Sequence, residues 1–191
     1  MQEAHRAYRR RSEAQTEKAS EQVAEKVLEK AQGGKEAQDY LGKRGVNEEN
    51  IERFKLGYAP AAWRSLLTFL EEKGYKRDDI VASGLAIRSE EGSVYDRFRG
   101  RLIFPIQNPS GQVAGFTGRT LTEDAKEAKY INTPQTLVYD KSSELYGIYQ
   151  AKRAIKEKDE ILLVEGNLDV ILSSQSGVEQ VVATSGTALT E

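Results

Sequence analysis

The sequence predicts a protein of the mixed α/β class, in which an α+β part with helices and a small antiparallel sheet precedes the first β-α-β unit of a parallel sheet. The unbroken apolar run Ile161–Val164 is typical of a strand that is buried on both faces of a parallel sheet. Two other apolar runs flank residues 108–111, whose sequence Asn-Pro-Ser-Gly suits a type I turn, and they therefore predict a β-hairpin. Earlier in the chain, apolar residues recur mostly at helical spacing.

The first part of the chain is predicted to be helical. Residues 1 to about 32 are dense in charges of both signs and carry a thin apolar stripe, which predicts one long helix that ends at Gly33-Gly34. A compact helical unit follows at residues 37–54. The next helix begins after Pro60 and is closed by Gly74. One face of it is formed by Trp63, Leu66, Leu67 and Leu70, and Trp63 is expected in the core.

The hairpin is expected to pair residues 102–106 with residues 113–116, within a small antiparallel sheet. Proline cannot donate a hydrogen bond to a neighbouring strand, so Pro105 predicts an edge strand or a bulge. Residues 126–141 predict irregular structure. A helix is expected from Ser143 to about Lys156, where it would bury Leu145, Ile148, Tyr149 and Ile155.

The last part predicts a β-α-β unit. Its first strand is the apolar run that ends at Val164, its helix passes through Val170 and Ile171, and its second strand covers residues 180–183. The loop at residues 184–187 is compatible with a phosphate cradle at a helix N-terminus and equally with a plain turn. Because two strands leave a sheet edge uncovered, we expect the chain to be cut short at Glu191.

Composition excludes several kinds of site. The chain of 191 residues has no cysteine and a single histidine, His5, so disulfides, thiolate sites and the usual zinc centres are excluded. No apolar run is long enough for a membrane span and no signal peptide is recognisable, so we expect a cytoplasmic protein without membrane contact. The net charge is only −2, but residues 97–119 contain four arginines and no acidic residue. This segment predicts a local cationic track for phosphates.

Two carboxylates form the second candidate site. Glu165 follows the apolar run directly, at the strand end where open α/β sheets bind ligands. Asp169 would lie in the first turn of the next helix and could approach the same space, so the pair could bind a hard divalent cation such as Mg²⁺. A structural alternative stays open for both, because strand-end acids and helix N-terminal aspartates are common for stability alone.

Several segments, in the same order, resemble bacterial DnaG-type DNA primases. They cover the chain from about Lys35 to its last residue. The matching segments are residues 40–45 (Tyr-Leu-Gly-Lys-Arg-Gly), 54–60, 96–106 (from Asp-Arg-Phe-Arg-Gly-Arg to Phe-Pro-Ile), 115–119 (Gly-Phe-Thr-Gly-Arg), 129–134 (Lys-Tyr-Ile-Asn-Thr-Pro), 145–147 (Leu-Tyr-Gly) and 165–169 (Glu-Gly-Asn-Leu-Asp). Each segment is weak evidence alone, but seven segments in the same order are specific for this family.

The resemblance implies a domain organisation and an activity. Residues 35–158 would be the N-terminal subdomain of the RNA polymerase core, and residues 159–191 the start of the metal-binding Toprim domain. Residues 1–34, which the resemblance does not cover, are the N-terminal charged helix that the charge pattern predicts. Proteins of this family synthesise short RNA primers on single-stranded DNA from ribonucleoside triphosphates, by metal-dependent nucleotidyl transfer. The family also works with a replicative helicase, through regions that this chain does not include.

The resemblance also implies roles for individual residues. Glu165 and Asp169 match the family's Toprim acids, which work with Mg²⁺ or Mn²⁺. The basic residues of the family's nucleic-acid groove match Arg97, Arg99 and Arg119, and two lysines linked to nucleotide and template phosphates match Lys129 and Lys141.

Some of these residues have plainer explanations. The arginine run from residue 97 to residue 101, taken as a strand, could simply form a solvated face. Both lysines are ordinary loop residues in isolation. Tyr130, Tyr139 and Tyr146 could stack bases, although tyrosines more often pack beneath loops.

Departures from the family pattern leave alternatives open. Asn167 and Leu168 stand where the family usually has Tyr and Met, the zinc ribbon is absent, and the paired Asp-x-Asp acids of the metal site would lie beyond Glu191. The isolated chain is therefore expected to be inactive or weak as a polymerase. The alternatives are a non-catalytic module that binds single-stranded nucleic acid, and another Toprim enzyme such as a phage primase-helicase or a nuclease.

Overall fold

The structure is a computed structural model, and it describes residues 34–122 and 127–184 together with residues 14, 16, 18–20, 22 and 23. Most of the predicted N-terminal helix therefore lies outside the described residues, as do the end of the chain and most of the predicted loop at residues 184–187. No helix in the described part is long and apolar enough to cross a membrane.

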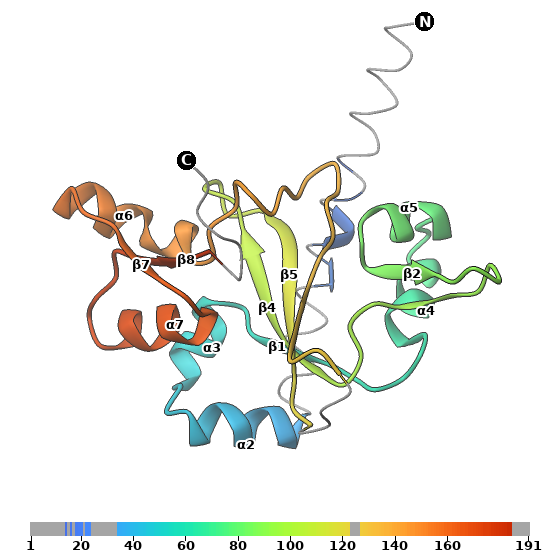
Figure 1. Ribbon diagram of the computed structural model, residues 1–191, viewed down its shortest axis with the longest axis horizontal. Coiled ribbons are helices and arrows are strands. Elements are labelled where there is room, and N and C mark those ends of the chain that lie inside the picture. The colour runs from blue at the N-terminus through green and yellow to red at the C-terminus, as the bar shows by residue number, and fades with distance from the viewer. Residues whose placement is uncertain are drawn as a thin grey trace, which may run out of the picture.

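The chain has the mixed α/β architecture that the sequence predicts, and Figure 1 shows how its elements are arranged. In chain order they are α2 (Lys35–Lys43), α3 (Glu48–Arg53), β1 (Gly57–Ala59), α4 (Ser65–Glu72), α5 (Arg77–Ala82), β2 (Ala86–Arg88), β3 (Val94–Asp96), β4 (Arg101–Gln107), β5 (Val113–Thr120), β6 (Tyr130–Asn132), α6 (Ile148–Lys158), β7 (Leu162–Val164), α7 (Asn167–Gln175) and β8 (Val181–Ala183).

An antiparallel sheet of order β1-β4-β5-β6 lies at the centre of the molecule. The predicted hairpin forms its middle pair, and the turn is closed by a 2.9 Å hydrogen bond that the Gly111 amide donates to the Asn108 carbonyl. Pro105 is tolerated in β4 because β1 pairs only with residues 101–103. The pairing with β5 is irregular one residue later, at Ile106 and Gln107. The hairpin and the bulge are thus confirmed, whereas the edge-strand alternative is wrong because β4 lies between β1 and β5.

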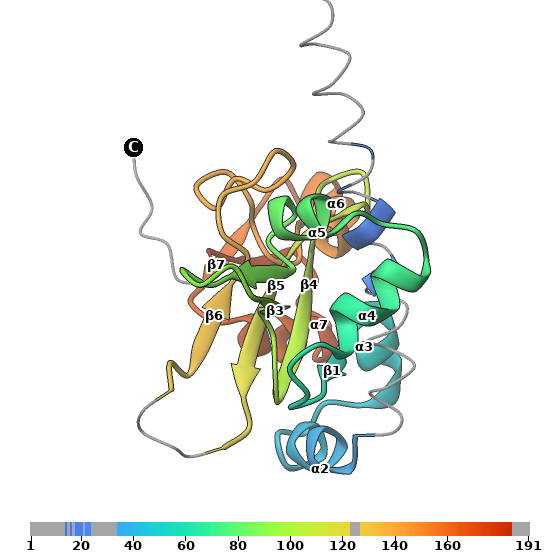
Figure 2. The same cartoon turned by 90° about the vertical axis from the view of Figure 1, so that its right-hand side faces the viewer.

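One face of the sheet is covered by a side lobe of α4, α5 and the β2–β3 pair, which faces the viewer in Figure 2. Buried apolar side chains of the lobe pack on Ile103 and Phe116 of the sheet. The lobe is held together by the buried Asp96 carboxylate, which accepts hydrogen bonds of 2.7 and 2.8 Å from the backbone N–H groups of Leu66 and Leu67. Asp96 therefore caps α4 from thirty residues away, and burial raises the pKa of its carboxyl group despite these bonds.

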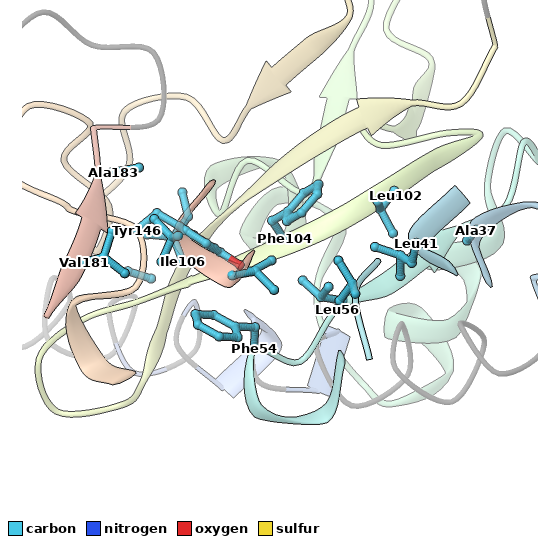
Figure 3. Close-up of a cluster of buried hydrophobic side chains, with 14 of the residues drawn as sticks. Ala37, Leu41, Phe54, Leu56, Leu102, Phe104, Ile106, Tyr146, Val181 and Ala183 are labelled. Carbon is cyan, nitrogen blue, oxygen red and sulfur yellow. The ribbon is translucent and has the colours of Figure 1, made fainter. Parts of the chain in front are cut away.

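The opposite face carries the second core, drawn in Figure 3. Alternate residues of a strand point to opposite faces, so Leu102, Phe104 and Ile106 of β4 turn toward this core. They meet side chains of α2, α3, α7 and β8, which joins the predicted β-α-β unit to the rest of the molecule. The buried Tyr146 lies in the middle, with its ring 6.0 Å from that of Phe54 between centroids.

A set of polar contacts also joins the α2–α3 region to α7 and the segment that follows it. The Gln175 side chain of α7 accepts a 2.9 Å hydrogen bond from the Asn47 backbone N–H and donates a 2.8 Å bond to the Gly45 carbonyl. Next to it, Arg53 forms a 2.8 Å ion pair with Glu179. The loop between α2 and α3 is thereby fixed to the helix that follows β7.

The β-α-β prediction is right in its order and wrong in its burial. The strands β7 and β8 pair in parallel, and α7 begins at Asn167 as expected. However, Leu162 and Leu163 are 40% and 44% exposed. The expected burial on both faces fails because β7 is a three-residue strand at the edge of a two-stranded sheet in the described part.

The helix predicted from Ser143 begins five residues later, at Ile148. Tyr146 instead forms an antiparallel bridge with Ala183, and Gly147 has a left-handed φ of 85°, which a regular helix excludes. The buried residues of α6 are Ala151 and Ala154. The expected burial of Leu145, Ile148, Tyr149 and Ile155 is wrong, since the first, second and fourth are only partly buried and Tyr149 is 37% exposed.

Three further local predictions are corrected. Trp63 is 63% exposed instead of buried, because it precedes α4 and is not part of its apolar face. Residues 97–100 lie between β3 and β4, so the arginine run is not one strand with a shared face. Within the segment expected to be irregular, residues 130–132 form the edge strand β6.

Candidate nucleic-acid interface

Arg119 of β5 is the centre of the candidate interface. It pairs across the sheet with Leu102 and Tyr130, and α2 approaches the same place with Tyr40. The guanidinium carbon of Arg119 lies 4.2 Å from the centroid of the Tyr40 ring and 5.7 Å from that of Tyr130. Both rings offer the negative face that attracts a cation. Arg119 is thus held by aromatic rings from two elements that are far apart in the sequence.

The guanidinium of Arg119 is also short of hydrogen-bond acceptors. The residue is only 8% exposed, and its Nε and Nη1 atoms are buried with no hydrogen-bond partner in the part of the chain that the structure describes. Buried donors without acceptors are uncommon in native proteins and cost free energy. A phosphate suits the planar fork of a guanidinium, and it would satisfy these covered donors if a neighbouring side chain moved aside on binding.

Arg44 is a basic residue of this surface that the sequence reasoning missed. Its guanidinium lies 5.5 Å from the centroid of the Tyr40 ring, so the Tyr40 ring makes cation–π contacts with both Arg44 and Arg119. Tyr40 and Arg44 are four residues apart at the end of α2, which is the spacing that brings side chains together on a helix. That spacing, inside a segment already matched to the primase family, was the available signal.

A second aromatic and cationic cluster lies at the end of β3. The guanidinium of Arg99 is 4.6 Å from the centroid of the Trp63 ring and 5.0 Å from that of Tyr95. The two rings meet nearly edge to face, with centroids 5.3 Å apart. Arg99 also donates a hydrogen bond to the backbone carbonyl of Asp96. An exposed tryptophan with a fixed arginine is suited to stacking and phosphate contact with a single strand.

Arg97 and Arg101 are bound to the protein itself. The Nε of Arg97 donates a 2.8 Å hydrogen bond to the Gly84 carbonyl. Arg101 is 5% exposed and donates a 2.9 Å bond to the Ala128 carbonyl, beside a 3.2 Å ion pair with Glu127. Burial lowers the pKa of both guanidinium groups, although an arginine stays charged at neutral pH. The arginines of this segment therefore differ in environment, and only Arg99 and Arg119 are stacked on aromatic rings.

The two lysines lie in different segments. Lys129 is exposed immediately before β6, where its carbonyl accepts a 3.0 Å bond from the Thr120 amide and extends the ladder with β5. It is therefore next to Tyr130 in the chain. Lys141 lies in the turn after Asp140, whose carboxylate accepts hydrogen bonds from the amide and the hydroxyl of Ser142. These bonds lower the pKa of Asp140 and keep this turn in a fixed conformation.

The candidate acids are placed as the sequence predicts. Glu165 follows β7 and is exposed, and Asp169 lies in the first turn of α7. The Oδ2 atom of Asp169 accepts a 3.1 Å hydrogen bond from the Gly166 amide, so this carboxylate also caps its own helix. Within the described residues, no group of three or more potential ligands could hold a metal ion. Two oxygen donors suit Mg²⁺ or Mn²⁺ but do not complete a site.

Comparison with known proteins agrees with this picture. The family model of the DNA primase catalytic core, N-terminal domain, matches residues 23–152. The DNA primase of Legionella pneumophila is 45% identical over 157 residues, which cover 81% of this chain and 26% of that protein. The DNA primase of Halalkalibacterium halodurans is 43% identical over 166 residues, with 86% and 27% covered. The chain thus spans about a quarter of the length of these curated relatives.

Solved structures show the same fold. The RNA polymerase domain of the Mycobacterium tuberculosis primase DnaG matches with a TM-score of 0.87 and 37% identity, over 93% of this chain and 58% of that chain. A DnaG primase catalytic domain bound to single-stranded DNA matches with a TM-score of 0.85 and 34% identity, over 96% of this chain and 58% of that one. The chain therefore belongs to the family of DNA primase catalytic cores, and the match covers the N-terminal domain of that core.

Proposed function

We propose that this chain is part of a primase core that synthesises short RNA primers on single-stranded DNA, and that its own share of the work is to hold the nucleic acid. The observation that carries the proposal is the guanidinium of Arg119, which is buried between two tyrosine rings with donors that lack acceptors in the described chain. A solved relative of the same fold is bound to single-stranded DNA. Arg44 and Arg99 would contribute further phosphate contacts, and Trp63 a stacking surface.

The proposal includes the domain assignment and the remaining partners. Residues 1–34 would form a charged N-terminal helix, residues 35–158 the N-terminal subdomain, and residues 159–191 the beginning of a Toprim domain. Lys129 and Lys141 would bind phosphates of ribonucleoside triphosphates or of the template. The replicative helicase would bind regions outside this chain. Such a protein acts in the bacterial cytoplasm.

Glu165 and Asp169 would hold part of the metal site. Their carboxylate oxygens are the donors that Mg²⁺ and Mn²⁺ prefer, and the exposed end of β7 leaves Glu165 accessible. Metal ions in such a site stabilise the attacking and leaving oxygens of a phosphoryl displacement. The bond of Asp169 to the Gly166 amide holds its carboxylate near the residue that follows Glu165. Further ligands would come from residues outside the described chain.

The proposed nucleic-acid binding is tested with a fluorescent thymidine oligonucleotide, whose binding is measured by anisotropy from 50 to about 200 mM salt. We expect the chain to bind, and its affinity to fall as salt rises. Replacing Arg119 by alanine should weaken binding and reduce the salt slope by roughly 0.7, the value for one phosphate contact on a single strand. Arg153 is the matched control, because it is an exposed arginine on α6, away from the candidate interface, whose ion pair is with Glu157 on the same helix. An unchanged slope in the Arg119 variant, or an equal loss in the Arg153 variant, would refute the proposal.

The proposed primer synthesis has to be tested with the longer protein. A primase that contains this chain and continues beyond residue 191 should make primers in the presence of Mg²⁺, and Glu165→Gln should abolish them. The isolated chain should make little or none, because the described residues supply only two candidate ligands. Robust synthesis by the isolated chain would contradict this. A non-catalytic binding module remains the second candidate, favoured by the same two-ligand site, and it would be supported if the longer protein binds the oligonucleotide but synthesises nothing.

A further inference from the structure

Gly84 lies in an unusual contact between the side lobe and the central sheet. It sits in the turn between α5 and β2, with a left-handed φ of 74°. A Cβ atom at this position would lie 2.6 Å from Cδ of Pro134 and 3.0 Å from Cγ2 of Thr133. Real Cβ atoms do not approach ring carbons so closely. The turn therefore touches the segment after β6 at a distance that only glycine allows.

The segment that Gly84 touches is the anchor of β6. Thr133 follows this strand directly and is 2% exposed. Its amide donates a 2.9 Å hydrogen bond to the Phe116 carbonyl, and its hydroxyl oxygen accepts a 2.9 Å bond from the Phe116 amide. One residue earlier, the Asn132 side chain accepts a 2.8 Å bond from the hydroxyl of Thr117. A shift of Thr133 and Pro134 would thus be transmitted to the pairing of β6 with β5.

The other side of Gly84 is fixed by hydrogen bonds. Its carbonyl accepts the 2.8 Å bond from Nε of Arg97, and its amide donates a 3.0 Å bond to the Val81 carbonyl. The amide of Arg97 also donates a 2.9 Å bond to the Leu85 carbonyl. The turn is therefore held firmly by α5 and by the residue that follows β3. Gly84 is buried whereas Pro134 is exposed, so an added Cβ would displace Pro134, and with it the end of β6, before the turn.

We propose that Gly84 is a positioning residue for nucleic-acid binding. By its close contact with Pro134 it sets the position of β6, and so the distance of Tyr130 from the guanidinium of Arg119. Arg97 contributes by holding the Gly84 carbonyl. This role rests on the proposed binding of nucleic acid at Arg119, and it gives the turn between α5 and β2 a part in that binding without contact to the ligand.

The test compares Gly84→Ala with a control that shares its backbone strain. Gly92 has a φ of 85° and nothing within 4 Å of an added Cβ, so Gly92→Ala adds the strain without the collision. A third variant, Pro134→Ala, removes the ring carbons that Gly84 faces, and a fourth combines it with Gly84→Ala. Two quantities are measured on the whole chain: hydrogen exchange at the Thr133 amide, and affinity for the thymidine oligonucleotide by anisotropy.

We expect Gly84→Ala to speed exchange at Thr133 and to weaken binding by about twofold to thirtyfold, the range found for couplings through packed residues. Gly92→Ala should change neither quantity. The double variant should bind better than Gly84→Ala, since Pro134→Ala removes the closest of the colliding atoms and the two effects are then not additive. Gly84→Ala with wild-type exchange and affinity would overturn the proposal, as would a double variant no better than Gly84→Ala.

Hydrogen exchange keeps this test separate from the test of the proposed function, and Pro134→Ala covers the case of a variant that does not fold. If the wild-type chain does not bind the oligonucleotide, the proposed function fails, whereas exchange at Thr133 still decides whether Gly84 holds β6. If Gly84→Ala does not fold, Pro134→Ala decides alone: faster exchange at Thr133 with weaker binding supports the proposal, and wild-type values for both overturn it.

Discussion

Replacing Trp63 by alanine should weaken the binding of single-stranded DNA by about thirtyfold and lower the free energy of unfolding by only about 1 kcal/mol, through the lost contacts with Tyr95 and Arg99. The side chain is 63% exposed, and Arg99 already stacks on its ring at 4.6 Å. A tryptophan presents at most about 250 Å² of surface, of which roughly 160 Å² is then exposed. A stacked base would cover about half of that, and at about 25 cal/mol per Å² the gain is roughly 2 kcal/mol. This value lies within the usual range for one base on an aromatic ring, and it corresponds to about thirtyfold in affinity.

The assay uses the fact that Trp63 is the only tryptophan of the chain. Its fluorescence should be quenched as the thymidine oligonucleotide binds, and Trp63→Phe, which keeps an aromatic ring, should retain most of the affinity. Tyr149 is the matched control, because it is 37% exposed and stacks with Lys152 at 4.3 Å on α6, outside the candidate interface. The reasoning is refuted if Trp63→Ala binds within twofold of the wild type, or if fluorescence does not respond to bound oligonucleotide.

The remaining predictions concern stability. Asp96→Ala removes the acceptor for two backbone N–H groups at the start of α4, and it should lower the free energy of unfolding by about 1–3 kcal/mol in urea titrations. Burial raises the pKa of Asp96, so the folded state binds this proton more tightly than the unfolded state. Stability should therefore fall as the pH rises from the ordinary pKa of about 4 through the raised pKa of the folded state. The melting temperature of Asp96→Asn should lack this part of the pH dependence. The hydroxyl of Tyr146 is buried without a partner in the described chain, so Tyr146→Phe should raise stability by about 1 kcal/mol, or roughly 2–4 °C in melting temperature; a lower melting temperature would indicate a hidden partner. Asp169→Ala should cost about 1 kcal/mol through the lost cap of α7, whereas Glu165→Gln should stay within about 0.5 kcal/mol, and equal losses would contradict the capping role.

The parts of the fold that were predicted correctly are those in which local pattern and tertiary packing agree. The hairpin turn at residues 108–111 and the helix that starts at Asn167 carry their signals within a few residues. The errors occur where a residue far away in the sequence determines where a helix begins. The start of α4 depends on the Asp96 side chain, and the late start of α6 depends on the bridge between Tyr146 and Ala183. Neither partner is visible in a local window of sequence.

The candidate site shows the same division. Residue type and the family resemblance singled out Arg99 and Arg119, and both are stacked on aromatic rings in the structure. Residue type and resemblance could not distinguish these two arginines from Arg97, whose Nε donates a hydrogen bond to a backbone carbonyl. Every residue has a backbone carbonyl, so the sequence carries no signal for such a bond. Trp63 was expected in the core because tryptophan is usually packed, and its exposure follows from its place before the helix. The binding and catalytic roles of all these residues stay predictions, for the three arginines as for the two acids and the two lysines.

The hydrogen bonds of Gln175 to the loop at residues 45–47 have a consequence for how the protein is made. Asn47 and Gln175 are 128 residues apart, so this contact waits for most of the chain to be synthesised. At 5–20 residues per second, a ribosome needs roughly 6–25 s to cover that interval. During this time α2 and α3 must remain without the helix that completes their core. Contacts of such sequence separation slow folding, and they leave the apolar side chains of the first helices open to chaperones on the nascent chain.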